Sequence, residues 1–281
     1  MFPSTVVVRM RGLNANESQM GTSILDVGSR SWKVKGNKTC VQTTNTGESL
    51  PAKIGRTIFS YDRVFDEYAS TEEIYEESSR ELVKSFVKGV SGSILAYGQS
   101  SSGKTYTMQG ESSIKEGSAS QNGVIQMIVR DIFSELTSFP ISAFLIRLSM
   151  IEVYNEEIRD LLSTSGDQKI ITRYDPKIGL SVDSVEKLVT DYASMINLFS
   201  IADEKRVVRN TEMNEKSSRS HVIYRITLER KDLNIIDGDS ADEAVQVSTL
   251  NIMDLAGFGT VGRKPKQLDD VQKEGISINK R

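Results

Sequence analysis

Eight consecutive residues have the types and spacing needed to hold phosphate groups. They are Gly98-Gln99-Ser100-Ser101-Ser102-Gly103-Lys104-Thr105, and they match the pattern G-x-x-x-x-G-K-[ST] in full. The glycines Gly98 and Gly103 permit backbone angles that turn successive N–H groups toward phosphate oxygens. Lys104 supplies a cation for the β- and γ-phosphates, and the Thr105 hydroxyl can ligate Mg²⁺. The segment, called the phosphate loop below, therefore predicts a nucleotide site.

The residues around the phosphate loop provide the context that this chemistry requires. Residues 93–97 form a short apolar run between turn residues and predict a buried strand, and a helix is expected from Lys104 onward. A chain of this length matches the pattern by chance about once in a hundred. The competing interpretation, a flexible Ser/Gly loop with a solvated lysine, is therefore disfavoured.

Two later segments carry further polar groups suited to nucleotide chemistry. Residues 214–221 gather hydroxyl groups around Arg219, but taken alone their composition favours a polar loop before a strand. Asp254 and Gly257 follow the apolar run 250–253. An aspartate at the end of a buried strand suits the water shell of Mg²⁺, and a glycine can present its N–H to a γ-phosphate. A simple turn at the end of a strand explains the same residues equally well.

The remaining pattern predicts alternating strands and helices. Apolar runs that are β-branched or alternate with polar residues predict strands at 6–8, 93–97, 144–154, 222–228 and 245–253. Helical spacing predicts helices at 71–89 with Thr71 as N-cap, from 104, at 123–136, for one or two turns at 155–162, and at 191–209 with Asp191 as N-cap. Residues 14–56 are expected to form an insert or a small hairpin lobe, and 111–122 an exposed loop. The alternation predicts an α/β sandwich.

Composition and charge exclude several classes of function. The 281 residues are 38% hydrophobic and 26% charged, which fits a folded globular protein. The net charge of −3 gives no overall field for gripping nucleic acid or an anionic membrane. One cysteine, Cys40, and one histidine, His221, exclude an internal disulfide and metal sites of several Cys or His. Because no long apolar run is present, we expect no membrane span, and the single thiol favours a reducing, intracellular compartment.

The phosphate loop, residues 214–221 and residues 254–257, taken in this order, resemble the kinesin motor domain. Further segments resemble the same family collinearly, so that the resemblance covers essentially the whole chain: 61–65, 96–99, 105–110, 152–156, 160–162, 273–275 and 278–280. The sequence is most similar to the centromere-associated kinesin-7 group. The resemblance implies an α/β P-loop NTPase fold, a three-layer sandwich whose mixed central sheet is flanked by helices.

The resemblance also implies how a nucleotide would be held. The phosphate loop would bind the phosphates of ATP or ADP, and Thr105 and Ser218 would lie at Mg²⁺. Arg9, Arg11 and Tyr106 would flank the adenine, Tyr106 by stacking on it.

The two later segments would be the family's nucleotide-sensing loops, switch I and switch II. Residues 214–221 would form switch I, and 254–257 would open switch II. The residues implied in catalysis are Asn214, Ser217, Ser218, Arg219, Asp254 and Gly257. His221 would be a structural residue at the start of a strand.

The chain departs from the family pattern at the base pocket and in switch II. The adenine motif R-x-R-P ends here in Gly12, which is expected to loosen one wall of the pocket. The switch II motif D-L-A-G-S-E ends here in Phe258 and Gly259, so the glutamate that pairs with Arg219 in the family is absent. Because phosphoryl transfer depends on positioning and charge placement, we expect slow hydrolysis unless Asp269 or Asp270 substitutes.

The third departure concerns extent. Relative to the family, residues 1–281 would be one motor domain that is incomplete at its C-terminus. Most of the tubulin-contacting helix region, the last strand and the last helix would be missing, and the dimerisation region would lie outside this chain.

The leading hypothesis is an ATP-binding microtubule motor domain that couples ATP hydrolysis to movement, with impaired hydrolysis. Its expected partners are microtubules, without nucleic acid or membrane, and its expected location is the cytoplasm and cytoskeleton, including the spindle or kinetochore. The alternative is a non-catalytic nucleotide-binding or microtubule-tethering module, favoured by Gly259. A signalling GTPase is disfavoured because no evident N-K-x-D base-reading motif is present and Tyr106 suits adenine.

Overall fold

The structure is a computed structural model that describes residues 4–12, 30–34, 36–46, 53–110, 122–138, 142–164, 170–176, 179–212, 219–232 and 245–258. The described residues belong to two compact units that divide between Ser78 and Ser79.

The first unit contains two small sheets. β1 (Val7–Arg9) pairs in parallel with β5 (Arg63–Phe65). β2 (Arg30–Val34), β3 (Thr39–Thr46) and β4 (Lys53–Ser60) form an antiparallel sheet in the order β2-β3-β4. The small lobe expected within residues 14–56 is therefore confirmed for these strands, as three strands rather than one hairpin.

The second unit is built on a six-stranded mixed sheet. Its strands are β6 (Gly92–Ala96), β7 (Ser142–Tyr154), β8 (Glu157–Asp160), β11 (Lys187–Val189), β12 (His221–Asp232) and β13 (Gln246–Asp254). They lie in the order β11-β7-β12-β13-β6, with β8 paired to β7. The β6–β13 pair is parallel and the other pairs are antiparallel. β9 (Thr172–Asp175) and β10 (Gly179–Val182) form a separate antiparallel pair.

The strand register gathers apolar residues on one face of this sheet. Leu148 of β7 lies opposite Ile226 of β12, which lies opposite Leu250 of β13, and all three are buried. Successive strand residues point to opposite faces, so every second residue of these strands enters the same core.

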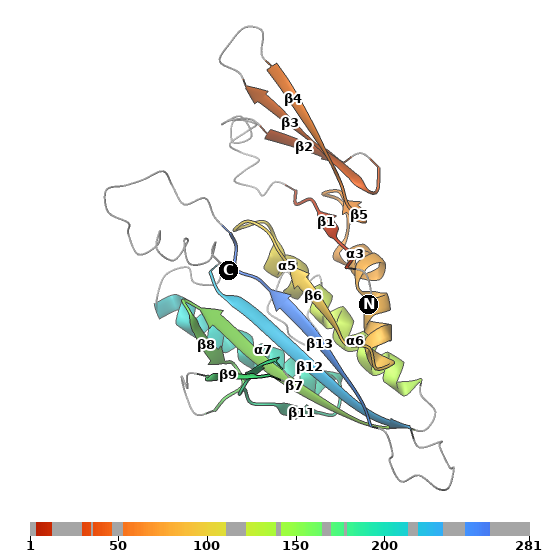
Figure 1. Cartoon of the computed structure of the whole chain (residues 1–281), viewed down its shortest axis with the longest axis vertical. Helices are drawn as coiled ribbons and strands as arrows, with labels where there is room; N and C mark the ends of the chain where they lie inside the picture. The colour runs from red at the N-terminus through yellow and green to blue at the C-terminus, as the bar shows by residue number, and fades with distance from the viewer. Residues whose placement is uncertain are drawn as a thin grey trace. The chain divides into compact units, whose positions relative to one another are not determined.

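Helices of the second unit cover that buried face. They are α4 (Arg80–Val87), α5 (Lys104–Gln109), α6 (Val124–Thr137) and α7 (Tyr192–Glu212), while α3 (Thr71–Ser78) belongs to the first unit. Figure 1 shows α6 and α7 behind the strands. Phe199 of α7 contacts the ring of Tyr224 of β12, with 5.1 Å between centroids. The predicted mixed sheet flanked by helices is confirmed.

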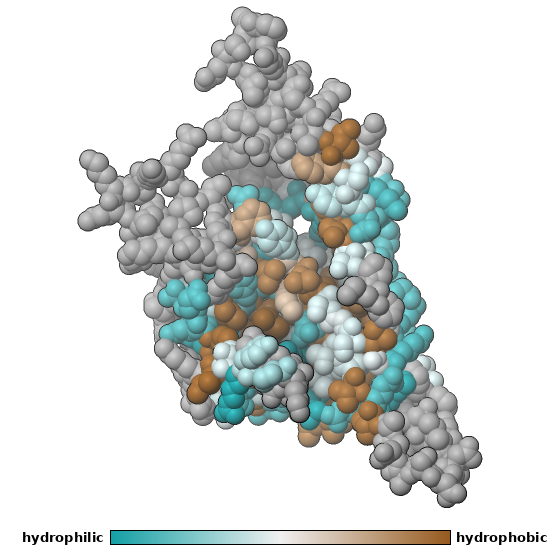
Figure 2. Space-filling view, viewed as in Figure 1, coloured by the Kyte–Doolittle hydropathy of each residue, from teal (hydrophilic) through white to brown (hydrophobic). Residues whose placement is uncertain are grey.

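The opposite face of the sheet is mixed in polarity. The register places an apolar row, Leu95, Met253 and Ile223, beside a polar row that includes Asn251 and Arg225. The Arg225 Nε–H donates to Asn251 Oδ1 at 3.1 Å. Figure 2 shows hydrophobic and hydrophilic residues side by side on the face toward the viewer.

The single helix expected at 71–89 is wrong, because Ser79 separates α3 from α4. α3 is capped by Ser70 rather than Thr71. The Ser70 hydroxyl accepts the Glu73 N–H at 3.1 Å, and the Ser70 N–H donates to Glu73 Oε2 at 2.8 Å, which is a reciprocal capping box. Gly89, with φ of 97°, follows the end of α4, where left-handed backbone favours glycine.

The helical turns expected at 155–162 are also wrong. Asn155 and Glu156 have φ of 47° and 66° and connect β7 to β8 as a tight hairpin. Two consecutive positive φ angles form the turn type that matches strand twist, and asparagine tolerates this conformation. At the end of β8, Asp160 Oδ1 accepts the N–H groups of Leu162 and Ser163 at 2.7 and 3.0 Å.

The other expected elements within the described part are confirmed with small shifts of their ends. Asp191 caps α7 as predicted, since its Oδ1 accepts the Ser194 N–H at 2.7 Å. Residues 111–121 of the expected loop lie outside the described residues. No described helix is long and apolar enough to cross a bilayer.

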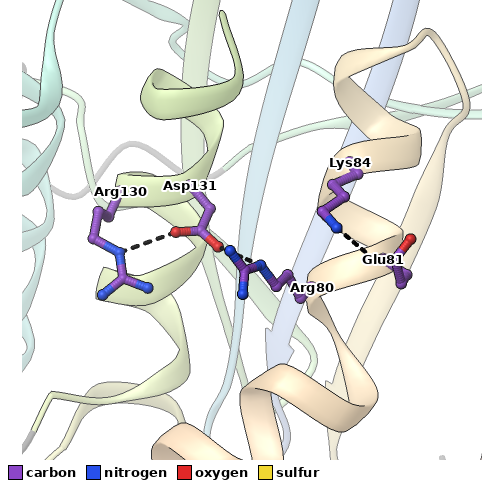
Figure 3. A network of polar contacts seen from close by, with 5 residues as sticks. All are labelled: Arg80, Glu81, Lys84, Arg130 and Asp131. Atoms are coloured by element: carbon purple, nitrogen blue, oxygen red, sulfur yellow. Dashed lines mark hydrogen bonds and ion pairs between the residues drawn. The ribbon is translucent and has the colours of Figure 1, made fainter. Parts of the chain in front are cut away.

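An ion pair links α4 to α6 in the second unit (Figure 3). The buried Asp131 of α6 lies 3.6 Å from Arg80 Nε of α4 and 3.0 Å from Arg130 Nε. Lys84 and Glu81 pair on the exposed side of α4 at 2.6 Å. The Asp131 carboxylate is therefore compensated by two guanidinium groups where the helices pack, as burial of a charge requires.

Candidate nucleotide-binding site

Two segments of the predicted site leave the sheet at the same edge. β6 leads into the phosphate loop, and β13 ends at Asp254. Because β6 and β13 are parallel neighbours with Ala96 opposite Asp254, the residues that follow them emerge side by side. Ligands of open α/β sheets bind outside the carboxyl ends of strands, which is where both segments lie.

The phosphate loop has a backbone that depends on its glycines. Gly103 has φ of 94° and Ser101 φ of 62°, both in the left-handed region. A Cβ atom at Gly98 would lie 2.6 Å from Ser102 Oγ. The left-handed backbone therefore favours glycine at position 103 apart from any ligand, whereas a side chain at position 98 would require the Ser102 hydroxyl to move.

Lys104 turns its ammonium group back into this loop. Its Nζ donates to the carbonyl oxygens of Gly98 at 3.0 Å and Gln99 at 2.9 Å. Burial lowers the pKa of Lys104, and the charge of Asp254 opposes that shift. The Lys104 ammonium group thus lies against backbone carbonyl groups of the phosphate loop.

Thr105 and Asp254 connect the loop to β13. The Thr105 hydroxyl donates to Asp254 Oδ2 at 2.7 Å. Asp254 is 4% exposed, and its Oδ1 atom is buried with no hydrogen-bond partner among the described residues. Mg²⁺ prefers hydroxyl, carboxylate and water oxygens, so this pair with one unused carboxylate oxygen fits the ion.

Opposing effects act on the Asp254 carboxyl. Burial raises its pKa, while the Thr105 hydrogen bond and the charges of Arg206 and Lys104 lower it. A further cation at this edge would favour the ionised form in the same way.

The residues after Asp254 pack closely on neighbouring loops. The Ala256 N–H donates to His221 Nδ1 at 3.1 Å, and β12 begins at His221, so its predicted place at a strand start is confirmed. A Cβ atom at Gly257 would lie 2.5 Å from Ser100 Cα. Gly257 therefore permits direct backbone contact between the segment and the phosphate loop.

A buried polar cluster that sequence reasoning missed joins α5, α7, β7 and β12. Arg206 lies 3.6 Å from Asp203 Oδ1 and 3.9 Å from Glu152 Oε1. The Gln109 side-chain amide donates to Asp203 Oδ1 at 3.3 Å and to the Tyr224 hydroxyl at 2.8 Å. This set is called the Arg206 cluster below.

The Arg206 cluster is electrostatically linked to the candidate site. Burial raises the pKa of Asp203, the charge of Arg206 lowers it, and the charge of Asp254 adds to the rise. The signal in the sequence was an acid and a base three residues apart on the apolar face of α7, since such charges are almost never buried unless paired.

The predicted adenine residues lie in different units. Arg9 donates to Thr71 Oγ1 at 3.2 Å and to the Ala69 carbonyl at 3.5 Å, and Arg11 is exposed in the same first unit. Tyr106 lies partly exposed on α5 of the second unit. Their common role at a base stays a prediction.

Most of the predicted switch I lies outside the described residues, namely Asn214, Ser217 and Ser218. Gly259 also lies outside them. Arg219 is described, half-buried in a turn just before β12. The structure therefore brings together the phosphate loop, Asp254 and Gly257, and it leaves the switch I assignments as predictions.

Comparison with known proteins decides the family. The protein-family model of the kinesin motor domain matches the sequence over residues 9–281. The chain belongs to the kinesin motor domain family. A solved kinesin structure, "Structure of a fast kinesin: Implications for ATPase mechanism and interactions with microtubules", matches 98% of this chain and 71% of that one, with a TM-score of 0.79 and 30% identity. The expected fold is thereby confirmed over nearly the whole chain.

Similar curated proteins include several of the kinesin-7 type. "Kinesin-like protein KIN-7L" of Oryza sativa subsp. japonica is 36% identical over 254 residues, which are 90% of this chain. "Centromere-associated protein E" of Homo sapiens is 34% identical over 280 residues, which are 98% of this chain. The predicted kinesin-7 resemblance is confirmed. The chain spans 37% and 9% of the lengths of these two relatives.

Proposed function

We propose that this kinesin domain binds ATP and ADP with Mg²⁺ and is a nucleotide-driven microtubule motor head. One observation carries the nucleotide part: the complete phosphate loop lies against Asp254 through the Thr105–Asp254 hydrogen bond of 2.7 Å. A loop lysine, a loop hydroxyl and a strand-end aspartate are the groups that P-loop NTPases use for phosphates and metal.

Each group has a distinct task in this proposal. Backbone N–H groups of the phosphate loop and the Lys104 ammonium bind the phosphate oxygens. Thr105 and Asp254 hold Mg²⁺ together with Ser218, and the bound ion neutralises charge on the β- and γ-phosphates. The Gly257 N–H contacts the γ-phosphate.

The remaining site assignments follow from membership of the family. Arg9, Arg11 and Tyr106 flank the adenine. Asn214, Ser217, Ser218 and Arg219 form the switch I side of the γ-phosphate. Loss of the γ-phosphate then moves both switches, as in other NTPase switches.

Motor activity requires that the moving switches change affinity for microtubules. Kinesin motor domains as a family are ATP-driven microtubule motors, and this membership supports the same partner here. The similarity to centromere-associated protein E supports a place on the cytoskeleton that includes the spindle or kinetochore.

A second function is favoured by Gly259. With no carboxylate at this position, the chain would hold nucleotide, or tether to microtubules, without turnover. This alternative shares the nucleotide site with the motor and differs only in the chemical step.

The test is steady phosphate release from Mg·ATP by the 281-residue chain, with and without microtubules, beside a fluorescent-nucleotide binding assay. The motor predicts release that microtubules stimulate, and the tethering module predicts nucleotide binding without release. Lys104→Ala is the control and should abolish nucleotide binding in a folded protein. Absence of nucleotide binding in the unaltered chain would refute the motor and the nucleotide-binding module alike, and would leave only nucleotide-independent tethering, which microtubule co-sedimentation tests.

A further inference from the structure

An aromatic pair joins the phosphate loop to the segment that follows β13. Tyr97, directly before the loop, stacks on Phe258 with 5.3 Å between ring centroids and 22° between planes. The two residues are 75% and 40% exposed, so the pair lies at the surface of the site. Stacked rings at this separation attract each other beyond the area that they bury.

One member of this pair differs from the motif that the sequence resembles. In the resemblance of residues 254–259 to the switch II motif D-L-A-G-S-E, Phe258 takes the place of serine. A serine has no ring to stack on Tyr97, so the contact comes from the residue that distinguishes this chain.

Backbone contacts beside the rings hold the same two segments together. The Ser100 N–H donates to the Phe258 carbonyl at 3.2 Å, and the Ser100 hydroxyl lies 3.5 Å from the Gly257 carbonyl. Gln99 and Phe258 also form an isolated parallel β-bridge. Any displacement of the segment from the loop must therefore separate Ser100 from both carbonyls and unstack the rings.

We propose that Phe258 is a positioning residue that sets the preference of the site for nucleoside diphosphate over triphosphate. By stacking on Tyr97 it holds residues 257–258 against Ser100. In NTPase switches, contacts with the γ-phosphate order the switch segments in a new conformation. A diphosphate lacks the γ-phosphate, so it does not require that conformation.

When residues 257–258 are held against Ser100, fewer molecules adopt the conformation that binds triphosphate. Apparent affinity falls in proportion to that population, so the stack weakens triphosphate binding and leaves diphosphate binding unchanged. An aromatic pair of this geometry corresponds to a factor of about two to ten in affinity. The inference rests on the proposed nucleotide function.

The experiment measures dissociation constants of the 281-residue chain for a fluorescent ADP and a fluorescent non-hydrolysable ATP analogue, both with Mg²⁺. The readout is the ratio of the triphosphate constant to the diphosphate constant. Phe258→Ser and Tyr97→Ser should each lower this ratio about two- to tenfold, and the double variant should lower it no further, because both changes remove one contact.

Three controls separate the stack from general effects. Phe258→Tyr keeps a ring and should keep the original ratio. Phe258→Leu keeps apolar bulk without a ring and should behave as Phe258→Ser. Tyr174→Ser removes a ring that is 77% exposed on β9, outside the stack, and should change nothing.

Unchanged ratios in both serine variants would overturn the inference while leaving the nucleotide function intact. An effect of Phe258→Ser without one of Tyr97→Ser would also overturn it, because the stack needs both rings. An unaltered chain that binds neither nucleotide would refute the proposed function itself and this inference with it.

Discussion

Gly259 stands where the resemblance to the family places the switch II glutamate, and we expect its lack of a carboxylate to slow hydrolysis. A carboxylate restored there would pair with Arg219 and help to orient the attacking water, so Gly259→Glu should raise phosphate release by about tenfold or more. Turnover of Mg·ATP measured with microtubules present checks this, and Gly259→Gln, which lacks the charge, is the matched control. Equal turnover in the glutamate variant and the original chain would show that Gly259 does not limit hydrolysis.

Asp254 is a second residue whose environment leads to a testable prediction, here on how stability depends on pH. Because burial raises its pKa, the folded state holds the proton more tightly than the unfolded state does. The ionised carboxyl therefore costs stability, and that cost grows as pH rises from about 4, the unfolded value, through the folded pKa. Asp254→Asn should raise the melting temperature at pH 7.5, should lose this advantage toward pH 4.5, and should weaken Mg²⁺-dependent nucleotide binding. A gain independent of pH would contradict the assignment of the cost to ionisation.

At the scale of elements, the Arg206 cluster ties α5, α7, β7 and β12 together through buried charges. Arg206→Ala would leave Asp203 and Glu152 buried without their cation, at a cost of about 3–5 kcal/mol in the free energy of unfolding. Urea denaturation measures this cost. Arg206→Ala made in the background of Asp203→Asn and Glu152→Gln should cost much less, and an equal cost in both backgrounds would mean that packing rather than charge is responsible.

Elements with strong periodicity were predictable from the sequence, and those decided by backbone detail were not. The helix α6 and the strands β12 and β13 follow from repeated apolar spacing, and Asp191 was recognisable as a helix cap. The hairpin at Asn155 was missed because its turn depends on two positive φ angles, which apolar spacing does not report. The break at Ser79 was missed because residues on both sides of it keep helical spacing.

At the scale of the whole molecule, some parts of the candidate site were predictable from local sequence and others depend on contacts that only the fold creates. The phosphate loop was predictable because its chemistry is local in sequence, and Asp254 because it ends an apolar strand. The contact of Thr105 with Asp254 and the stack of Tyr97 on Phe258 join residues 149 and 161 positions apart, and the parallel β6–β13 pairing brings them together. The Arg206 cluster depends in the same way on four elements meeting in one core.

Binding of Mg·ADP by the whole chain should be measurable as a rise in its melting temperature. A ligand that binds only the folded state at about a hundred times its dissociation constant stabilises that state by about 2.7 kcal/mol. For a chain of this size we expect Mg·ADP to raise the melting temperature by roughly 5 °C. Calorimetry with and without the ligand measures the shift, and Lys104→Ala should show none. A melt that Mg·ADP leaves unmoved at saturating concentration would contradict the nucleotide site, whereas a shift abolished by Lys104→Ala would locate binding at the phosphate loop.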